Sequence, residues 1–464
     1  MPSNDYVTVI GGGLAGSEAA YQLAEKGVPT VLYEMKPEVY SLAHELPYLA
    51  ELVCSNSLRG DRPDQGVGLL KAEMRLAGSL ILACAEKTKV PAGGALAVDR
   101  ELFAAAVTER IEAHPLIRIE RERVTSLAPF RDQPVIVATG PLTDSSLFDE
   151  IQTLLGLDNL HFFDAAAPIV EADSIDRSIV FAQSRYHKGG DDYLNCPMTK
   201  AEYLAFREAL LTAERADVHD FEDDKLFSGC MPIESLADRG EDTMRFGPLK
   251  PVGLTDPRTG EEPYAVVQLR QDNAAASLYN LVGFQTRLKF PEQRRVFGMI
   301  PGLAAAEFAR YGVMHRNTFL RSPGILDRFY RLIKQPRIMF AGQITGVEGY
   351  IESAASGLLA GRVMAATVRG EDPASAEPEL TREETMIASL GRYIATADPK
   401  DFQPMKATFG LLPEMNSGER GRLRKAYGIN LRGRKARRLM YTARALEQAG
   451  MEEERIAEII SAAM

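Results

Sequence analysis

The feature that most constrains this chain is a glycine turn between a strand and a helix near the N-terminus. In "YVTVIGGGLAGSEAAYQLAEKG" a β-branched apolar run precedes Gly11, Gly13 and Gly16 in GxGxxG spacing, and a helix follows that ends at Gly27. Glycines at these positions let the backbone approach a pyrophosphate at the positive end of the helix. The pattern predicts a Rossmann-like unit that binds a dinucleotide.

An acidic residue supports this interpretation. The next apolar run, "PTVLYE", ends in Glu34, eighteen residues past Gly16. A carboxylate at this point would accept hydrogen bonds from the adenosine ribose hydroxyls. A tight turn in an α/β domain without a nucleotide is the alternative, and these residues alone do not distinguish NAD from FAD.

Two later segments favour FAD. "PVIVATG" predicts a strand that leads to Gly140, and "RIMFAGQITGVEGYIESAASGLLAG" predicts a closing strand, a loop with Gly342 and Gln343, and a helix near Tyr350. In two-segment flavoproteins this last helix directs its N-terminus at the flavin ring. Gln343 stands where many of them have an aspartate. The sequence contains no second strand, GxGxxG and helix unit, so we expect no separate nicotinamide domain.

These segments divide the chain into three predicted regions. We expect an FAD-binding domain from residues 1–165 plus 330–380, an α+β insertion at 166–329, and a mostly helical C-terminal region at 381–464 with a basic tail. The insertion contains a helix that starts with a Thr199-x-x-Glu202 capping box. The predicted fold class is α/β, a Rossmann-like FAD-binding fold of the glutathione-reductase type.

Composition indicates the compartment. The apolar runs fall short of the ~20 residues that a membrane helix needs, and "MPSNDY" has no apolar signal core. The four cysteines and six histidines show no metal-ligand spacing. We therefore expect a cytoplasmic protein with free thiols, no metal and no membrane partner.

Two of the cysteines are candidates for reactivity. Cys230 precedes Pro232 and the predicted helix "PIESLADRG", so the helix dipole would favour its thiolate, as would Arg245 and Lys250 downstream. Cys54 lies where a predicted apolar helix gives way to the polar stretch "SNSLRG". Position alone leaves an inert, buried thiol as an equal alternative for both.

The other two cysteines are predicted to be structural. Cys84 shares one face of a long helix, predicted over "VGLLKAEMRLAGSLILACAEK", with Leu70, Met74 and Ile81. Cys196, in "YLNCPMTK", is predicted to be a small buried apolar residue.

A series of motifs gives the chain a family resemblance. "GGGLAGSEAA", "ELVCSNSLRG", "GGALAVDRE", "DYLNCPM", "GCMPIE", "RFGPLKPVGL", "AVVQLRQDNAA", "YGVMHRNTF" and "FQPM" with "FGLLP" follow one another between residues 7 and 413. In this order and spacing the chain resembles the methylenetetrahydrofolate-tRNA-(uracil-5-)-methyltransferases. One departure is Lys406, which replaces the asparagine usual after "FQPM".

The resemblance implies an activity and its cofactors. The chain would methylate a uridine of the tRNA T-loop to ribothymidine, with FAD, 5,10-methylenetetrahydrofolate and NADH or NADPH as reductant. By resemblance the Cys230 thiolate adds to uracil C6, and Cys54 acts as the base or stabilises the methylene intermediate. Tyr350 is the predicted flat surface for folate against the flavin.

A basic segment is the candidate RNA contact. Between Met415 and Leu446 there are ten Lys or Arg residues and one acid, within a chain of net charge −10. This segregation could place cations along phosphates, although a solvated charged face is the ordinary alternative. The predicted contacts are Arg422, Arg424, Lys425, Arg434, Lys435, Arg437 and Arg438.

Three alternatives to the tRNA reaction remain open from the sequence. The same chemistry could act on a ribosomal RNA uridine, and the residues do not separate these two targets. A flavin- and folate-dependent enzyme that modifies the wobble uridine would share the N-terminal fold but gives no reason for "GCMPIE" and "CSNSLRG". A non-catalytic flavoprotein that binds RNA would have no need of both candidate thiols.

Overall fold

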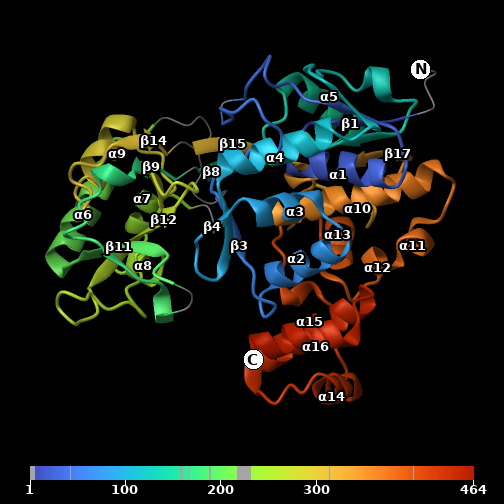
Figure 1. Ribbon diagram of the computed structural model, residues 1–464. Coiled ribbons are helices and arrows are strands. Elements are labelled where there is room, and N and C mark those ends of the chain that lie inside the picture. Colours follow the sequence, from blue (N-terminus) through green and yellow to red (C-terminus); the bar gives the residue numbers. More distant parts are fainter. Residues whose placement is uncertain are drawn as a thin grey trace.

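The computed structural model describes residues 6–41, 43–156, 160–165, 167–187, 190–216, 231–312, 314–400 and 402–464. Figure 1 shows two parts side by side, one with the N-terminal strands and α10, the other with β9, β11 and β12. Helices α14, α15 and α16 lie below the first part in this view.

The first part is built on a six-stranded sheet whose members come from both ends of the chain. Its order is β16-β17-β7-β1-β2-β6, and the strands from β17 to β6 are parallel. The chain fills one side of β1 with β2 and β6 and then crosses to the other side with β7. Ligands bind outside the carboxyl ends of strands at such a reversal. The bounds are β1 Val7–Ile10, β2 Thr30–Tyr33, β6 Ile117–Glu120, β7 Val135–Val137, β16 Arg331–Leu332 and β17 Gln335–Phe340.

Two helices of this part touch backbone to backbone. They are α1, Leu14–Glu25, and α10, Tyr350–Val368. A Cβ added to Gly357 would lie 2.1 Å from the Ala15 carbonyl oxygen, and one added to Gly361 would lie 2.6 Å from that of Ala19. Because both pairs advance by four residues, the two helices run parallel and their N-termini point the same way.

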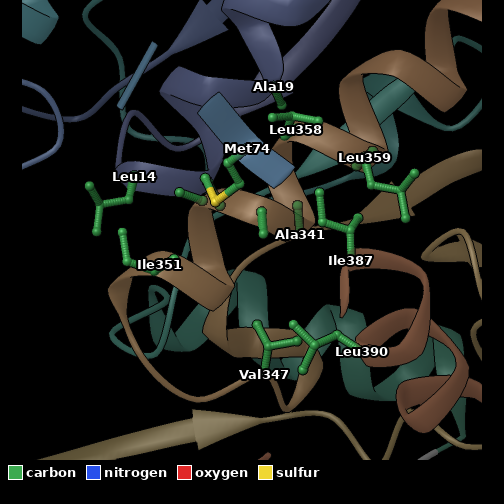
Figure 2. Close-up of a cluster of buried hydrophobic side chains, with 14 of the residues drawn as sticks. Leu14, Ala19, Met74, Ala341, Val347, Ile351, Leu358, Leu359, Ile387 and Leu390 are labelled. Carbon is green, nitrogen blue, oxygen red and sulfur yellow. The ribbon is translucent and has the colours of Figure 1, made fainter. Parts of the chain in front are cut away.

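Around this contact lies an apolar core, part of which Figure 2 shows. Leu14 and Ala19 from α1, Leu358 from α10, and Leu390 from the C-terminal region are fully or almost fully buried in one cluster. The core also includes α2, Gly66–Leu76, α3, Leu80–Lys87, and α13, Met386–Thr396.

The single long helix predicted around Cys84 is wrong. The segment breaks at Gly78, whose φ is +74°, into α2 and α3. The start of α3 is capped by a buried carboxylate, since Glu18 accepts hydrogen bonds from the backbone N–H groups of Leu80 at 3.1 Å and Ile81 at 2.9 Å. Burial raises the pKa of Glu18, although these hydrogen bonds oppose the rise.

The second part has its own six-stranded sheet, in the order β10-β11-β12-β13-β9-β14. All its strands lie between residues 169 and 310, inside the predicted insertion. The predicted capping box at Thr199 and Glu202 is confirmed. Strand β10 is only two residues long, and a 3₁₀ turn at Arg185–His187 follows it. The strands are β9 Ile169–Glu171, β10 Phe181–Ala182, β11 Tyr193–Met198, β12 Ala265–Gln271, β13 Leu278–Leu281 and β14 Phe308–Arg310.

Helices around this sheet form a separate apolar core with it. The region contains α6, Lys200–Thr212, α7, Ile233–Asp238, α8, Thr243–Phe246, and α9, Phe290–Phe297. A two-stranded ladder of β8, Leu160–Ala165, and β15, Met314–Phe319, belongs to the two connections between the parts.

The remaining elements flank the first sheet. A three-stranded sheet pairs β3 Ser57–Gly60, β5 Ala95–Val98 and β4 Lys89–Val90. Helices α4 and α5 span Arg100–Glu112 and Ser145–Leu155. Helices α11 Pro373–Ala376 and α12 Pro378–Thr381 lie at the end of the predicted 330–380 segment. The C-terminal region that follows contains α13, α14 Ser417–Ala426, α15 Gly433–Gln448 and α16 Glu453–Ala463.

The contact between α1 and α10 predicts opposite effects for two alanine substitutions. Gly357→Ala places a methyl group against the Ala15 carbonyl and should lower the free energy of unfolding by about 2–3 kcal/mol. Gly421→Ala in α14 meets no atom within 4 Å. It removes a glycine from an exposed helix interior and should raise stability by about 0.5–1 kcal/mol. Urea unfolding followed by circular dichroism measures both, and equal effects would contradict the close approach.

Candidate active site

A cavity lies at the carboxyl ends of β1 and β7. Among the residues that line it are seven of the eight predicted cofactor contacts: Gly11, Gly13, Glu34, Gly140, Gly342, Gln343 and Tyr350. Gly16 lies beneath the turn instead, where an added Cβ would lie 1.8 Å from the Gly11 carbonyl oxygen. The structure brings these residues together, and their contact with a cofactor stays a prediction.

The shape of the cavity fits a dinucleotide. Gly13 precedes α1 and has no side chain to cap its first N–H groups, and a Cβ there would meet no atom within 4 Å. Gly349, with φ of +112°, precedes α10 without a side-chain cap, and Tyr350 and Ser353 from the first turn of α10 line the cavity. Two helix N-termini therefore face one cavity, which suits a ligand with a pyrophosphate and a ring that becomes anionic on reduction. These residues fit FAD.

Glu34 is fixed next to the glycine turn. Its Oε2 accepts a hydrogen bond from the Gly12 N–H at 2.8 Å, and its Oε1 accepts one from the Lys36 N–H at 2.9 Å. The carboxylate is 7% exposed and lines the cavity. Its position at the end of β2 is the one expected of a ribose contact.

A second cavity adjoins the first. Gln343 and Tyr350 line both, so the two spaces meet at these side chains. The second is also lined by Cys54, Ser55, Ser57, Arg59, Arg270, Asn280 and Lys406. The candidate thiol Cys54 thus lies next to the predicted flavin site.

Tyr350 supports the Cys54 loop. Its hydroxyl oxygen accepts hydrogen bonds from the backbone N–H groups of Cys54 at 2.6 Å and Ser55 at 3.2 Å. Burial raises the pKa of Tyr350 above its ordinary value, so the hydroxyl stays protonated. The predicted stacking of Tyr350 on folate stays a prediction.

The apolar helix predicted before Cys54 is wrong. Residues 47–56 form turns, bends and irregular backbone, and the next regular element is β3. Because the loop lacks helical hydrogen bonds, side chains from α4 bind some of its backbone N–H and carbonyl groups. Thr108 Oγ1 accepts from the Leu49 N–H at 2.8 Å, and Arg100 Nη1 donates to the Leu52 carbonyl at 2.8 Å.

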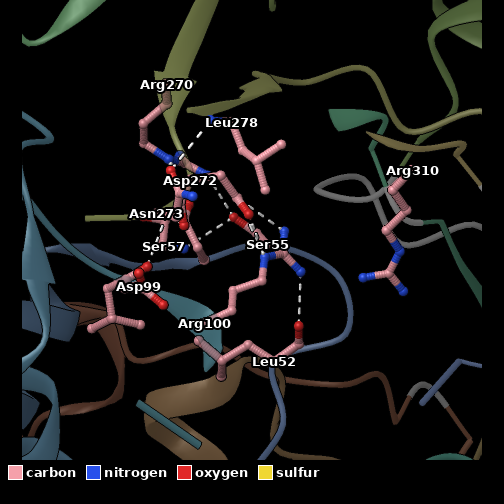
Figure 3. Close-up of polar contacts among 12 residues, drawn as sticks. Leu52, Ser55, Ser57, Asp99, Arg100, Arg270, Asp272, Asn273, Leu278 and Arg310 are labelled. Atoms are coloured by element: carbon pink, nitrogen blue, oxygen red, sulfur yellow. Dashed lines mark hydrogen bonds and ion pairs between the residues drawn. The ribbon is translucent and has the colours of Figure 1, made fainter. Parts of the chain in front are cut away.

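A buried polar network joins this loop to the second sheet (Figure 3). From β12, Arg270 Nη2 donates to Ser55 Oγ at 2.7 Å and its Nε donates to Asn56 Oδ1 at 3.0 Å. Arg100 Nε donates to Asp272 Oδ2 at 3.0 Å. The loop that carries Cys54 is therefore fixed from both parts of the molecule.

The network also places cations around the thiol. Burial lowers the pKa of Arg270, and attraction to Tyr193, Asp272 and the Cys54 thiolate opposes that change. Arg100 is likewise attracted to a Cys54 thiolate. Two guanidinium groups therefore lie within electrostatic reach of a Cys54 thiolate, and one of them, Arg100, is paired with Asp272.

The sequence did not single out Arg100 or Arg270. Arg270 stands within "AVVQLRQDNAA", a motif of the resemblance, and near the end of the apolar run in that motif. A charged side chain within such a run is the available signal, since a buried arginine requires partners.

Of the other three cysteines, the structure describes Cys84 and Cys196 but not Cys230. Cys230 lies in 217–230, outside the described residues, so its predicted role is not tested. Arg245, one of the two cations predicted to favour its thiolate, donates to Asp242 at 2.7 Å and lies 3.7 Å from the Tyr264 ring centroid. Cys84 and Cys196 are buried as predicted. Burial raises the pKa of the Cys84 thiol to about 11.

The basic segment is divided by its contacts. Arg422 Nη1 donates to Glu447 at 2.8 Å, Arg424 Nε donates to the Ile429 carbonyl at 2.9 Å, and Lys435 Nζ donates to the Met464 carbonyl at 3.0 Å. These three stabilise the C-terminal helices. Arg438 lines a groove, and Lys425, Arg434 and Arg437 are exposed.

The described ranges contain neither a membrane-spanning helix nor a cluster of metal ligands. No helix there is long and apolar enough to cross a membrane. Nor do His, Cys, Asp or Glu residues of those ranges gather in a group of three or more that could hold a metal ion.

The chain is similar to known proteins over most of its length. Residues 6–372 match the family model described as glucose inhibited division protein A. A Geobacter sulfurreducens protein named methylenetetrahydrofolate--tRNA-(uracil-5-)-methyltransferase TrmFO is 57% identical over 435 residues, which cover 94% of this chain and 97% of that protein. An Enterococcus faecalis protein of the same name is 57% identical over 88% of this chain and 92% of its own length.

A solved structure is similar in fold. Aquifex aeolicus GidA superposes with a TM-score of 0.65 at 14% identity, and the match covers 98% of this chain and 74% of that one. The predicted fold class, α/β with a Rossmann-like FAD-binding fold, is confirmed.

The cations beside Cys54 predict its reactivity. Replacing Arg270 with methionine should slow alkylation of Cys54 by iodoacetamide at neutral pH several-fold, and should move the pH profile of the rate upward, because the thiolate loses an attracting charge. Peptide mass spectrometry reports Cys54 separately from the other thiols. Arg270→Lys should react at an intermediate rate.

A matched control is Arg258→Met, a surface arginine of the second part that pairs with Asp256 at 2.7 Å. It should leave the rate unchanged. A faster reaction in Arg270→Met would show that Arg270 only restrains the loop, because loosening the loop exposes the thiol without changing its charge.

Proposed function

Because the chain belongs to the methylenetetrahydrofolate–tRNA-(uracil-5-)-methyltransferase family, we propose that it methylates C5 of a tRNA uridine with a carbon from 5,10-methylenetetrahydrofolate. The observation that carries this proposal is the close, nearly full-length identity to relatives of that name. The substrate nucleotide we propose is the T-loop uridine, which becomes ribothymidine.

The first cavity would hold FAD. The start of α1 at Gly13 would bind the pyrophosphate, Glu34 would bind the ribose, and the start of α10 at Tyr350 would face the flavin. When bound and reduced, FAD supplies the hydride that turns a C5 methylene into a methyl group. We propose NADH or NADPH as the source of the electrons.

The thiols would do the nucleophilic and proton-transfer work. The Cys230 thiolate would add to uracil C6, which makes C5 nucleophilic enough to bond to the folate carbon. The C5 proton then leaves and the bond between the transferred carbon and the folate nitrogen breaks, which releases tetrahydrofolate and forms the exocyclic methylene. When hydride is added to that methylene, the C6–sulfur bond breaks and the Cys230 thiolate is released. Cys54, with Arg100 and Arg270 beside it, would accept the C5 proton or stabilise the methylene.

The nearest alternative function differs from the proposed one only in its target RNA. The same chemistry on a ribosomal RNA uridine requires the same cavity and thiols, so the assay must include both RNAs. The names of the relatives favour tRNA over ribosomal RNA as the substrate, and uracil C5 methylation over modification of the wobble uridine.

The proposed reaction predicts a defined product. Purified protein with FAD, methylenetetrahydrofolate and NADPH should convert unmodified tRNA to a product with ribothymidine in the T-loop, located by nuclease digestion and mass spectrometry. Cys230→Ala should lose at least a hundredfold in rate and keep its FAD, because only base activation is removed. Methylation of ribosomal RNA alone would move the target, and full activity of Cys230→Ala would exclude it as the nucleophile.

The glycine turn predicts loss of cofactor without loss of fold. In Gly13→Val the added side chain points into open space in the protein and should occupy the place of the pyrophosphate. The variant should unfold at a wild-type temperature when both are stripped of FAD, yet purify with little flavin absorbance. Gly421→Ala serves as the control that keeps full flavin content. A fully loaded Gly13→Val would contradict the assigned pyrophosphate position.

A further inference from the structure

A polar groove lies where three separate regions of the chain meet. Arg62 and Gly93 line it from the flavin-binding part, Arg185 and Tyr193 from the second part, and Arg438 from α15. It has a volume of about 650 Å³. Figure 1 shows how these regions converge, with α15 beneath α2 and with β11 in the part alongside.

The groove is positive although the chain as a whole is acidic. Its lining includes Arg62, Arg185 and Arg438, and the acid among the lining residues is Asp64, which pairs with Arg62 at 3.0 Å. Arg438 lies 5.9 Å from the Phe409 ring centroid. A local cluster of cations in a protein of net charge −10 marks a site for a polyanion.

The groove also offers an exposed aromatic surface. Tyr186 is 55% exposed, and its ring packs on the backbone of Gly253, where an added Cβ would lie 2.9 Å from the ring. The ring is thus supported from the side of Gly253. Proteins that bind single-stranded nucleic acid combine such aromatic surfaces, on which bases stack, with cations that follow the backbone.

The lining of the groove continues into the Cys54 cavity. On β3 and the residues after it, Ser57 and Arg59 line the cavity, whereas Gly60 and Arg62 line the groove. On β12, Arg270 lines the cavity and Gln268 lines the groove, two residues apart on the same face. Two strands therefore lead from the thiol to the groove.

We propose that this groove binds the RNA strand that flanks the uridine in the Cys54 cavity. Arg438 contacts phosphates, and Tyr186 stacks on an unpaired base, while Arg185, which donates to Gln268 Oε1 at 2.9 Å and to the Val252 carbonyl at 3.2 Å, adds its charge to the groove. The inference rests on the proposed function, because a base must leave its stack to reach the thiol and binding of the flanking strand offsets that cost. Within the basic segment, the proposal assigns RNA contact to Arg438. Arg422, Arg424 and Lys435 instead stabilise the C-terminal helices.

The test compares two arginines of the same segment. Arg438→Gln removes a groove cation, and Arg432→Gln removes an exposed one at the start of α15 that does not line the groove. Fluorescence anisotropy with a T-arm hairpin RNA gives Kd at several salt concentrations, and methylation assays give kcat and KM. Flavin reduction by NADPH is measured in parallel.

For Arg438→Gln we expect Kd and the KM for RNA to rise about five- to tenfold, and the salt slope of log K to fall by about 0.7–0.9, the value of one lost phosphate contact. Flavin reduction and the KM for folate should stay at wild-type values. Tyr186→Ala should weaken binding about tenfold with an unchanged salt slope, because stacking carries no charge. Arg432→Gln should match the wild type throughout.

The outcomes separate this inference from the proposed function. Wild-type methylation together with an unaffected Arg438→Gln, or an equal loss in Arg432→Gln, would overturn the groove and leave the reaction intact. RNA binding that Arg438→Gln weakens, without methylation by the wild type, would support the groove and overturn the reaction.

Discussion

The site depends on the contact between α1 and α10. Gly357 and Gly361 bring the backbone of one helix onto Ala15 and Ala19 of the other, and the two run parallel. Side chains of ordinary size would keep the axes 8–10 Å apart and separate the two N-termini. Because the contact is between backbones, the N-termini of both helices lie at one cavity. A single cavity can therefore bind both the nucleotide and the flavin ring.

The same arrangement fixes the loop that carries Cys54. Tyr350 begins α10, lines both cavities and accepts hydrogen bonds from Cys54 and Ser55. Arg270 reaches the loop from the second sheet. The thiol is therefore held by one residue whose position follows from the flavin-binding core and by another whose position follows from the second part. The position of Cys54 therefore depends on the packing of both parts.

Much of the first part could be predicted from local signals. The glycine turn, the strand that ends in Glu34 and the closing helix each depend on residues close in sequence, and all occur where the pattern indicates. The break at Gly78 was missed, since apolar residues on both sides keep a helical period, and a carboxylate distant in sequence, Glu18, caps the new helix. The irregular loop before Cys54 was missed for the same reason, because its partners Thr108 and Arg100 lie far along the chain.

The candidate site was predictable only in part. Glycines and a thiol carry signals of their own, whereas Arg270 acquires its role from pairing across two sheets. Within the basic segment, composition could not distinguish cations that hold carbonyl groups, such as Arg424, from one that faces a groove, such as Arg438. That difference depends on helix packing.

The order in which the sheet acquires its strands has a consequence for synthesis. Strands β1 and β2 leave the ribosome early, but β17 ends at Phe340 and α10 follows it. Until then the face of α1 with Ala15 and Ala19 lacks its partner, while the second part, complete by residue 310, can already fold as a unit. Cofactor capture is therefore a late event in the life of the nascent chain. By then the second part of the molecule can already be folded.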